Sequence, residues 1–422
     1  MSALHTVSPI LNAIVDQHVA DLAGLWNART DHTRAPHVAL RHLLRVDNRI
    51  AAHLDGCLVA GDEGQKLLHA QLVDPGPPAV FAVAVVALEA RNPVAFHQGV
   101  SLVEPVEGAA SGVIAALGWV ERDRLAGVIR EFLNSSSAVR CRLGLAACRV
   151  HRVDPGPALT NGMKDADPGV RGEALRSVGT LGRHELVSQL AAWKDDDPAV
   201  QFWAAWAAVL LGDRERALET LIQRGFTDGP ERERAFRLAL QAMSPAAVHK
   251  ALQKIATDPG RFRWLITGSG IAGDPTYVPW LIKHMADDKT ARLAGEAFSL
   301  ITGTDLAWLD LERKPPENFE SGPNDDPDDP NVEMDEDDGL PWPDPARVQR
   351  WWEANANRFA PSTRYFCGAP VTREHCLHVL KEGYQRQRIL AAHHLCLLQP
   401  GTPLFNTSAP AWRQKRLLAQ MA

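Results

Sequence analysis

Ser136-Ser-Ala-Val-Arg140, Asp167-Pro-Gly-Val-Arg171 and Asp197-Pro-Ala-Val-Gln201 repeat one short pattern, and a run rich in Ala and Leu follows each segment. The central residues Val139, Val170 and Val200 are 31 and 30 residues apart. A fixed period of roughly 20 to 50 residues is typical of a solenoid, in which each unit buries its apolar face against its neighbours. The sequence therefore predicts stacked helical repeats.

Each repeat carries signals for the start and the end of a helix. Ser136, Asp167 and Asp197 can accept hydrogen bonds from free backbone N–H groups at a helix start. Pro is suited to the first helical position, and Gly to the left-handed turn that ends a helix. Two of the repeats have both residues in these places: Pro168, Gly182, Pro198 and Gly212.

Two helices in about 30 residues, with Asp-Pro-x-Val-Arg opening the second, resemble HEAT repeats of the short bacterial type. The chain has only three Tyr and few β-branched runs, which argues against sheets. We therefore predict an all-α fold, an α-solenoid of HEAT-like helix pairs with an acidic loop and a smaller helical C-terminal region.

Composition divides the chain into three predicted regions. Residues 1–313 form the solenoid, 314–344 an acidic Pro-rich loop, and 345–422 a basic helical C-terminal region. The first helix is predicted to open at Ser8-Pro9. Its buried stripe is expected to follow three- and four-residue steps: Ile10, Ile14, His18, Leu22 and Leu25.

Charge, cysteines and hydropathy predict a cytoplasmic protein. The formal net charge of −6 disfavours a generic nucleic-acid binder, because such proteins neutralise phosphates with Lys and Arg. The six Cys form no Cys-x-x-Cys pair, as expected of reduced thiols. The N-terminus lacks a signal-peptide pattern, and the longest apolar run, Ala79 to Leu88, is too short to cross a bilayer.

Motifs that would indicate an enzyme are weak or missing. Gly268-Ser-Gly-Ile-Ala-Gly273 matches Gly-x-Gly-x-x-Gly, but that motif binds a dinucleotide only between a strand and a helix, and a turn between helices is favoured here. The chain has no Gly-x-Ser-x-Gly, no Walker loop and no His-Glu-x-x-His. We predict no catalytic residues and no cofactor.

Two weak metal patterns occur in the C-terminal third. The acidic residues Glu333, Asp335, Asp337 and Asp344 have an EF-hand-like spacing, although Gly339 is one place late. His375, Cys376, His378, His393, His394 and Cys396 could supply zinc ligands. A solvated linker and core cysteines are the favoured interpretations, so no metal is predicted.

The acidic loop and the region that follows it carry opposite charge. Glu317 to Asp344 has twelve acidic and no basic residues, whereas Ala346 to Ala422 has eleven Lys or Arg against three Glu. We expect the loop to dock on the basic region through salt-sensitive ion pairs.

Several C-terminal motifs resemble an uncharacterised proteobacterial HEAT-repeat family over nearly the whole chain. They are Ala294-Gly-Glu-Ala-Phe-Ser-Leu-Ile-Thr-Gly303, Gly339-Leu-Pro-Trp-Pro-Asp344, Trp351-Trp352, Arg364-Tyr-Phe-Cys-Gly368 and Gln385-Arg-Gln-Arg-Ile389. Members of such families often accompany type VI secretion genes. The resemblance implies an accessory or adaptor role, and it carries no catalytic residues.

A candidate partner-binding patch emerges when the repeats are aligned on their Val residues. Trp203 and Trp206 then replace Glu173 and Arg176 of the preceding repeat. The next period places Arg234 and Arg237 at the same positions, and an earlier one places Arg142 there. Trp and Arg are enriched at interface hot spots, so this patch is a candidate for contact with a protein. The alternative is that the two Trp side chains pack within the protein.

Three functions are compatible with these observations. The first is a non-enzymatic scaffold or adaptor that binds a protein on its concave face, for example a secretion effector or spike component. The second is a protein resembling bilin lyases, which also have short HEAT repeats. The third is DNA binding of the kind seen in HEAT-like glycosylases.

Overall fold

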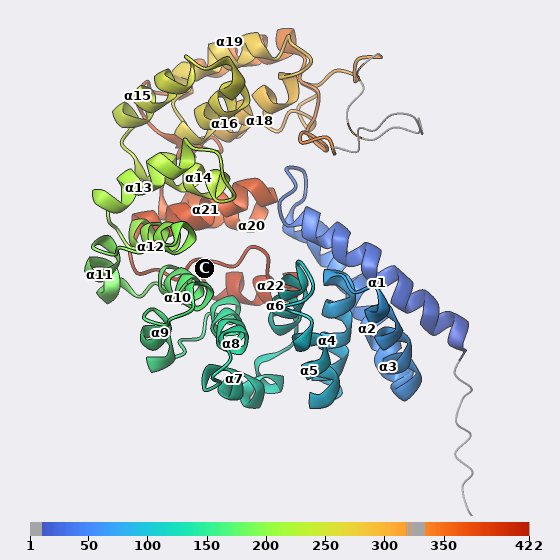
Figure 1. Cartoon of the computed structure of the whole chain (residues 1–422). Helices are drawn as coiled ribbons and strands as arrows, with labels where there is room; N and C mark the ends of the chain where they lie inside the picture. The colour runs from blue at the N-terminus through green and yellow to red at the C-terminus, as the bar shows by residue number, and fades with distance from the viewer. Residues whose placement is uncertain (1–10, 318, 320–321, 323–333, 422) are drawn as a thin grey trace, which may run out of the picture. The chain divides into compact units, whose positions relative to one another are not determined.

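The computed structural model of the protein describes residues 11–317, 319, 322 and 334–421 (Figure 1). Ser8, Pro9, Ile10 and most of the acidic loop lie outside these residues. Helices dominate the described chain, and its one sheet is a pair of two-residue antiparallel strands, β1 (Tyr365–Phe366) and β2 (Ala369–Pro370). The predicted all-α helical solenoid is confirmed.

The chain forms two compact units. The first contains Met1–Arg34, Leu40–Leu181 and Phe405–Ala422, and the second contains Ala35–Ala39 and Gly182–Leu404. The helices of the first unit are α1 (Asn12–His32), α2 (Leu40–Val59), α3 (Gly61–Ala70), α4 (Pro77–Glu89), α5 (Pro93–Ser101), α6 (Ala109–Trp119), α7 (Ala126–Leu133), α8 (Ala138–His151), α9 (Pro157–Gly162), α10 (Pro168–Leu181) and α22 (Ala411–Gln420), with 3-10 turns at Gln71–Val73 and Arg122–Arg124.

The core of the first unit centres on α4. Every residue from Val80 to Leu88 is buried, which explains the longest apolar run of the sequence as a helix surrounded by protein. A β-carbon at Gly112 of α6 would lie 2.4 Å from the backbone oxygen of Pro77. Glycine therefore lets α6 approach α4 closely.

The predicted stripe of the first helix is partly wrong. Ile14 is 52% exposed, whereas Val15, Val19, Leu22 and Leu25 are buried against the rest of the unit. At the N-terminal end of α1 the buried stripe therefore lies about one residue away from its predicted position. The cause is that both Ile14 and Val15 suit a buried stripe, and packing against α2, α3 and α4 selects Val15.

The second unit stacks helices in two rows, as Figure 1 shows. The outer row contains α11 (Val187–Ala191), α13 (Arg216–Gly225), α15 (Pro245–Ile255) and α17 (Val278–His284). The inner row contains α12 (Pro198–Leu210), α14 (Arg232–Ala242), α16 (Phe262–Ala272) and α18 (Ala291–Thr302). The unit also contains α19 (Pro345–Asn355), α20 (Arg373–Glu382) and α21 (Gln385–Leu398), with 3-10 turns at His184–Leu186, Pro259–Arg261, Pro275–Tyr277 and Ala356–Arg358.

The predicted helix starts are largely as expected. Asp197 Oδ1 accepts hydrogen bonds from the backbone N–H groups of Ala199 (2.8 Å) and Val200 (3.0 Å). Asp167 Oδ1 likewise accepts from Val170 N–H at 2.9 Å. In the first of the three repeats the capping residue is Ser137 and not Ser136, because the helix begins one residue later.

The C-terminal residues of each unit bind the carboxyl ends of helices in that unit. In the second unit, Arg364 donates to the backbone oxygens of Leu240, Gln241 and Met243 at the end of α14, and to that of Ala272 at the end of α16. Cys367 N–H donates to Leu300 O in α18. The last carbonyls of a helix have no partner within the helix, so these contacts satisfy them.

The first unit repeats this arrangement with other residues. Arg413, which is buried, donates to the backbone oxygens of Gly118 (2.6 Å), Trp119 (3.1 Å) and Val120 (3.0 Å) at the end of α6. Asn406 donates to Val150 O near the end of α8 at 3.1 Å. The basic C-terminal residues thus cap helices, which accounts for part of the positive charge seen in the sequence.

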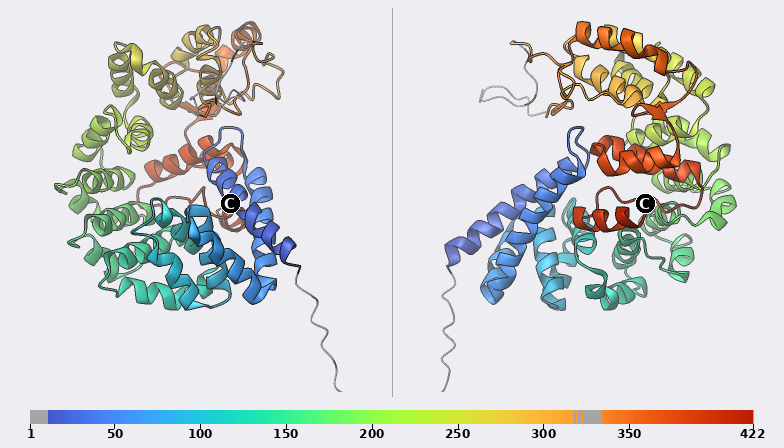
Figure 2. Two further views of the ribbon diagram at one scale, coloured as in Figure 1. Left: turned by 45° about the vertical axis from the view of Figure 1, so that its right-hand side comes forward. Right: turned by 180° about the vertical axis from the view of Figure 1, so that it is seen from behind.

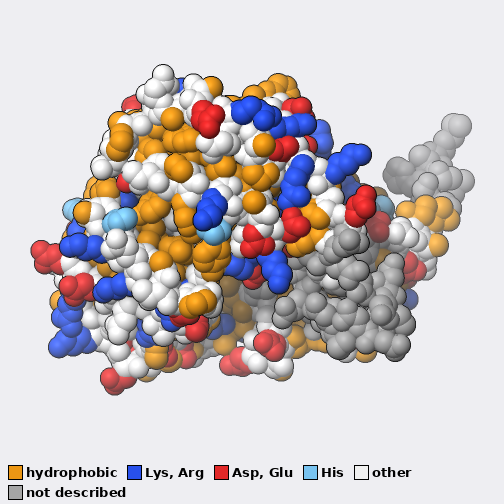
Figure 3. All heavy atoms as spheres, turned by 90° about the horizontal axis from the view of Figure 1, so that it is seen from above, with side chains coloured by type: hydrophobic (Ala, Val, Ile, Leu, Met, Phe, Trp, Pro, Cys, Tyr) orange, Lys and Arg blue, Asp and Glu red, His pale blue; other side chains and the backbone are white. Residues whose placement is uncertain are grey.

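Helices α16 to α19 of the second unit enclose a hydrophobic core of their own, which includes Ile266, Leu281, Phe298 and Val348. Hydrophobic side chains also gather on the outside of this part of the unit, over α15 to α19 (Figure 3). The rings of Phe262, Trp280 and His284 pack edge to face, with centroids 4.7 to 5.9 Å apart. These contacts join α16 to α17.

Candidate partner-binding face

The two Trp side chains of the predicted patch lie on α12 but differ in burial. Trp206 is only 4% exposed, whereas Trp203, one turn earlier, is half-buried. Their rings pack edge to face with centroids 5.4 Å apart. Trp206 therefore packs inside the unit, as the alternative interpretation expected, and Trp203 keeps part of its surface exposed.

One arginine of α14, Arg234, lies beside Trp203. The guanidinium of Arg234, which is exposed, lies over the Trp203 ring at 5.1 Å from the centroid, a cation–π arrangement. Arg237 forms an ion pair with Glu233 one turn away on the same helix. Of the two predicted arginines, Arg234 thus contacts Trp203 and Arg237 contacts Glu233.

The remaining predicted patch residue, Arg142, belongs to the first unit. It lies on α8, and a β-carbon at Gly169 would be 3.4 Å from its Nη1 atom. The patch described below therefore contains only residues of the second unit.

Helix α21 covers the carboxyl halves of α12 and α14. It packs against α12 and α14, which Figures 1 and 2 show from several sides. Gln241 near the end of α14 donates to Leu390 O at 3.0 Å, and its Oε1 atom accepts from His393 Nδ1 at 3.0 Å. The half-buried Trp203 and Arg237 and the exposed Arg234 lie in the amino-terminal or central turns of α12 and α14. We call Trp203, Arg234 and Arg237 the Trp–Arg face.

A carboxylate–arginine cluster occupies the same end of the next two inner helices. Asp335 pairs with Arg292 of α18 through two hydrogen bonds (2.6 and 3.0 Å), and Asp337 pairs with Arg263 of α16 in the same way (2.7 and 3.0 Å). Asp337 is only 4% exposed. The Asp337 carboxylate raises the pKa of Arg263. Two-point Arg–carboxylate pairs are among the strongest protein hydrogen bonds.

This cluster corrects the expectation for the acidic loop. Its described end docks on arginines of the solenoid, and the basic C-terminal region contributes Arg386, which donates to the backbone oxygen of Glu336 at 3.3 Å. Asp335 and Asp337, two residues of the EF-hand-like spacing, bind arginines instead. Glu333 lies outside the described residues. Sequence could not identify Arg263 and Arg292 as the partners, since 74 residues separate Arg263 from Asp337 and 43 separate Arg292 from Asp335.

The His and Cys residues of the zinc pattern differ in burial, since His375 is half-buried and His378 is exposed. Cys376, Cys396, His393 and His394 are buried, and in the described part of the chain no three His, Cys, Asp or Glu side chains form a metal-binding group. Burial lowers the pKa of His393 to about 3, with Arg237 and Arg234 adding to the shift. Burial and Arg364 lower that of His394 to about 3. Both side chains are neutral at physiological pH.

Acid should destabilise the protein through His393 and His394. Their folded-state pKa values lie below the ordinary value of 6.5, so the unfolded chain takes up protons first as pH falls. The neutral histidines make their full contribution to the free energy of unfolding above about pH 6.5, and this contribution is lost as pH falls toward 3. At pH 5 the loss is about 2 kcal/mol for each histidine.

Urea denaturation at pH 7.5 and pH 5 measures this loss. His393→Gln should reduce the difference between the two pH values, because Gln can keep a hydrogen bond to Gln241 without titrating. The exposed His249 on α15 serves as the control, and His249→Gln should leave the difference unchanged. Equal stability of the wild-type protein at both pH values would contradict the account.

The Gly-x-Gly-x-x-Gly match lies inside α16 and at its end. A β-carbon at Gly270 would lie 2.8 Å from the Cα atom of Ala297 in α18, so this glycine allows close helix packing. Gly273 adopts a positive φ of 70° and ends the helix, and Tyr365 N–H donates to its carbonyl oxygen at 2.8 Å. The turn interpretation is correct for Gly273, and the rest of the motif is helical.

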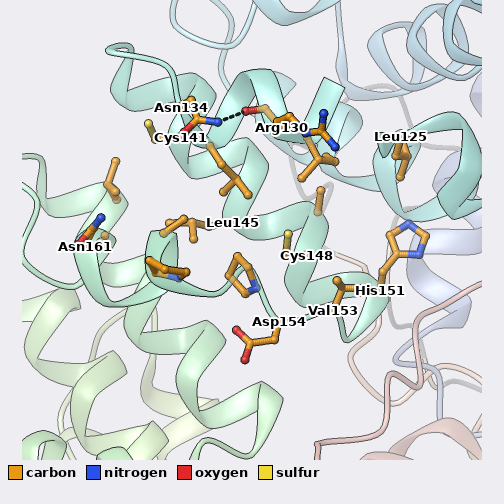
Figure 4. Close-up of a pocket in the computed structure, with 18 of the residues that line it drawn as sticks. Leu125, Arg130, Asn134, Cys141, Leu145, Cys148, His151, Val153, Asp154 and Asn161 are labelled. Atoms are coloured by element: carbon orange, nitrogen blue, oxygen red, sulfur yellow. Dashed lines mark hydrogen bonds between the residues drawn. The ribbon is translucent and has the colours of Figure 1, made fainter. Parts of the chain in front are cut away.

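A hollow lies in the first unit between α7, α8 and α9 (Figure 4). Its volume is about 810 Å³, and Cys141, Leu145 and Cys148 line it along α8. Burial raises the pKa of Cys148 to about 11 and also raises that of Cys141. Both thiols are therefore protonated near neutral pH and are poor nucleophiles. Burial also lowers the pKa of His151, at one end of the groove, to about 4.

Comparison with protein families identifies the repeats. The family described as HEAT repeats matches residues 156–241. The chain contains HEAT repeats. The matched HEAT repeats extend from α9 to α14 and include Trp203, Trp206, Arg234 and Arg237. Comparison with curated proteins and with solved structures gave no match.

HEAT repeats commonly mediate protein–protein interaction. The family match therefore points to binding of a protein as the general activity of this region. No helix among the described residues is both long and apolar enough to cross a membrane.

Proposed function

We propose that the protein is a non-enzymatic interaction scaffold, and that the Trp–Arg face contacts its partner. The observation that carries the proposal is the pair formed by Trp203 and Arg234 inside the HEAT match: Trp203 is half-buried, Arg234 is exposed, and their side chains stack. Such residues contribute strongly to binding, because they combine a large contact area with directional polar groups. Their mutual stacking also holds both side chains in place, which lowers the entropy lost on binding.

The finer proposal is an accessory role in type VI secretion, such as loading of an effector or a spike component. It rests on the resemblance of the C-terminal motifs to a family that accompanies secretion genes. In the structure, residues of those motifs hold the fold together: Arg364 caps α14, and Arg386 pairs with Glu296 of α18 at 2.8 Å. The motifs therefore support a shared fold more directly than a shared partner.

DNA binding has less support than protein binding. The arginines of α16 and α18 that could meet phosphates, Arg263 and Arg292, are already paired with Asp337 and Asp335. The net charge is also −6. Affinity for a duplex rests largely on neutralisation of phosphates by Lys and Arg, and a negative net charge disfavours it.

Affinity capture from the native host tests the proposal. Wild-type protein should retain a specific partner, and the double variant Trp203→Ala with Arg234→Ala should lose it while keeping its helicity. Arg216→Ala, which removes an exposed arginine from the outer helix α13, is the matched control and should retain the partner. Equal retention by all three proteins would contradict the proposed face. A partner unrelated to secretion would contradict only the finer proposal.

A further inference from the structure

The structure contains its own example of how the inner helices bind an acidic segment. Asp335 and Asp337 lie two residues apart and pair with Arg292 and Arg263, which occupy the second position of α18 and α16. Glu336 adds an ion pair to Arg263 at 3.0 Å. One short acidic segment thus spans the amino-terminal turns of two neighbouring inner helices.

Aromatic rings complete this arrangement. The guanidinium of Arg292 lies 4.8 Å from the ring centroid of Trp342 and 5.3 Å from that of Phe319. The planar group therefore stacks on aromatic rings and presents its edge to the Asp335 carboxylate. An arginine held in this way loses little freedom when it binds a carboxylate.

The Trp–Arg face has the same components on the next two inner helices. Arg234 is the third residue of α14 and stacks on Trp203 of α12 at 5.1 Å. Arg237 follows one turn later and is paired with the exposed carboxylate of Glu233. Arg237 is half-buried, but the Glu233 carboxylate is exposed, so a second carboxylate can replace Glu233 on Arg237.

The site that binds Asp335 and Asp337 and the Trp–Arg face lie in one row of inner helices. Helix α14 contacts α16, and α16 contacts α18. From Asp335 to Asp337 the acidic segment passes from α18 to α16. The next helix in the same direction is α14, where Arg234 and Arg237 lie.

We propose that the Trp–Arg face binds an extended acidic segment of a partner protein, with carboxylates on Arg234 and Arg237 and the chain lying across α12 and α14. The proposal rests on the proposed function, since it names the chemistry of the partner at the same face. Charge complementarity and the Asp335–Asp337 precedent select an acidic segment as the occupant. Binding should weaken as salt is raised, because it depends on exposed charges.

A labelled peptide with the sequence of residues 333–342, Glu-Met-Asp-Glu-Asp-Asp-Gly-Leu-Pro-Trp, is the probe. The full-length protein keeps its own copy of this segment on Arg263 and Arg292. Being tethered, this copy has a high effective concentration there, so added peptide should bind at the Trp–Arg face. Fluorescence anisotropy at low salt should show binding to wild-type protein. Arg234→Ala with Arg237→Ala should weaken it at least tenfold, and Arg216→Ala should leave it unchanged.

Two further measurements keep the proposal falsifiable. A peptide with Asn and Gln in place of its acidic residues should not bind. Arg263→Ala should leave binding of the acidic peptide to the Trp–Arg face intact. The proposal is overturned if wild-type protein does not bind the peptide, or if Arg263→Ala removes binding while the Arg234 and Arg237 variant keeps it. If partner capture still depended on Trp203 in that case, the proposed scaffold function would stand. Only the proposal that the partner binds through an acidic segment would be rejected.

Discussion

Replacing Arg364 with alanine is expected to lower the free energy of unfolding by about 3 kcal/mol or more, because several buried carbonyls lose a charged donor at once. Arg364 donates to Leu240 O and Met243 O at 3.0 Å and also to Gln241 O and Ala272 O. Burial lowers the pKa of its guanidinium, because the group has lost much of its contact with water. Urea denaturation followed by circular dichroism measures the change.

Two further variants test whether lost hydrogen bonds at the helix ends cause the fall in the free energy of unfolding. Arg364→Lys keeps the charge but not the planar group that reaches two helix ends, so it should lose most of the same stability. Arg373→Ala removes an exposed arginine nearby in sequence and should change stability by less than about 0.5 kcal/mol. Hydrogen exchange should quicken at the carboxyl ends of α14 and α16 in Arg364→Ala. Unchanged exchange and stability in that variant would refute the capping role.

Trp206→Ala is expected to cost about 3 to 5 kcal/mol, as large-to-small changes at buried aromatic residues do. Trp206 is 4% exposed and lies under Trp203 on α12. Trp203→Ala should cost less, because the Trp203 ring already has part of its surface in water. The two variants therefore separate folding from binding on one helix: the first should impair stability, and the second should impair partner capture.

The indole nitrogen of Trp206 refines this prediction. Nε1 is buried and has no hydrogen-bond partner among the described residues. A buried donor without a partner costs roughly 1 to 3 kcal/mol, so Trp206→Phe should be much milder than Trp206→Ala. Thermal melting of the three variants tests the order. If Trp206→Ala melts at the wild-type temperature, the assignment of Trp206 to the core is wrong.

The repeat pattern predicted the inner helices because their signals are local. Val170 and Val200 are both buried, and Asp167 and Asp197 form the expected caps. Capping and helical periodicity depend on residues three or four positions apart, which a sequence displays directly. The all-α solenoid followed from these signals.

The differences between Trp203 and Trp206 could not be predicted in this way. Both are large aromatic residues three positions apart on one helix. Helix α21, which packs on α12 and α14, lies about 190 residues further along the chain. The same limit applies to Arg364, whose carbonyl partners in α14 are more than 120 residues away. Only the folded structure brings such residues together.

The most direct test of the scaffold role is site-specific photo-cross-linking in the native host. A benzoylphenylalanine placed at position 203 reports what contacts the Trp–Arg face, and the same group at the exposed Lys250 on the outer helix α15 is the control. We expect position 203, and not position 250, to cross-link to another protein. Cross-links from position 203 only to residues of the same chain, or identical products from both positions, would contradict the account.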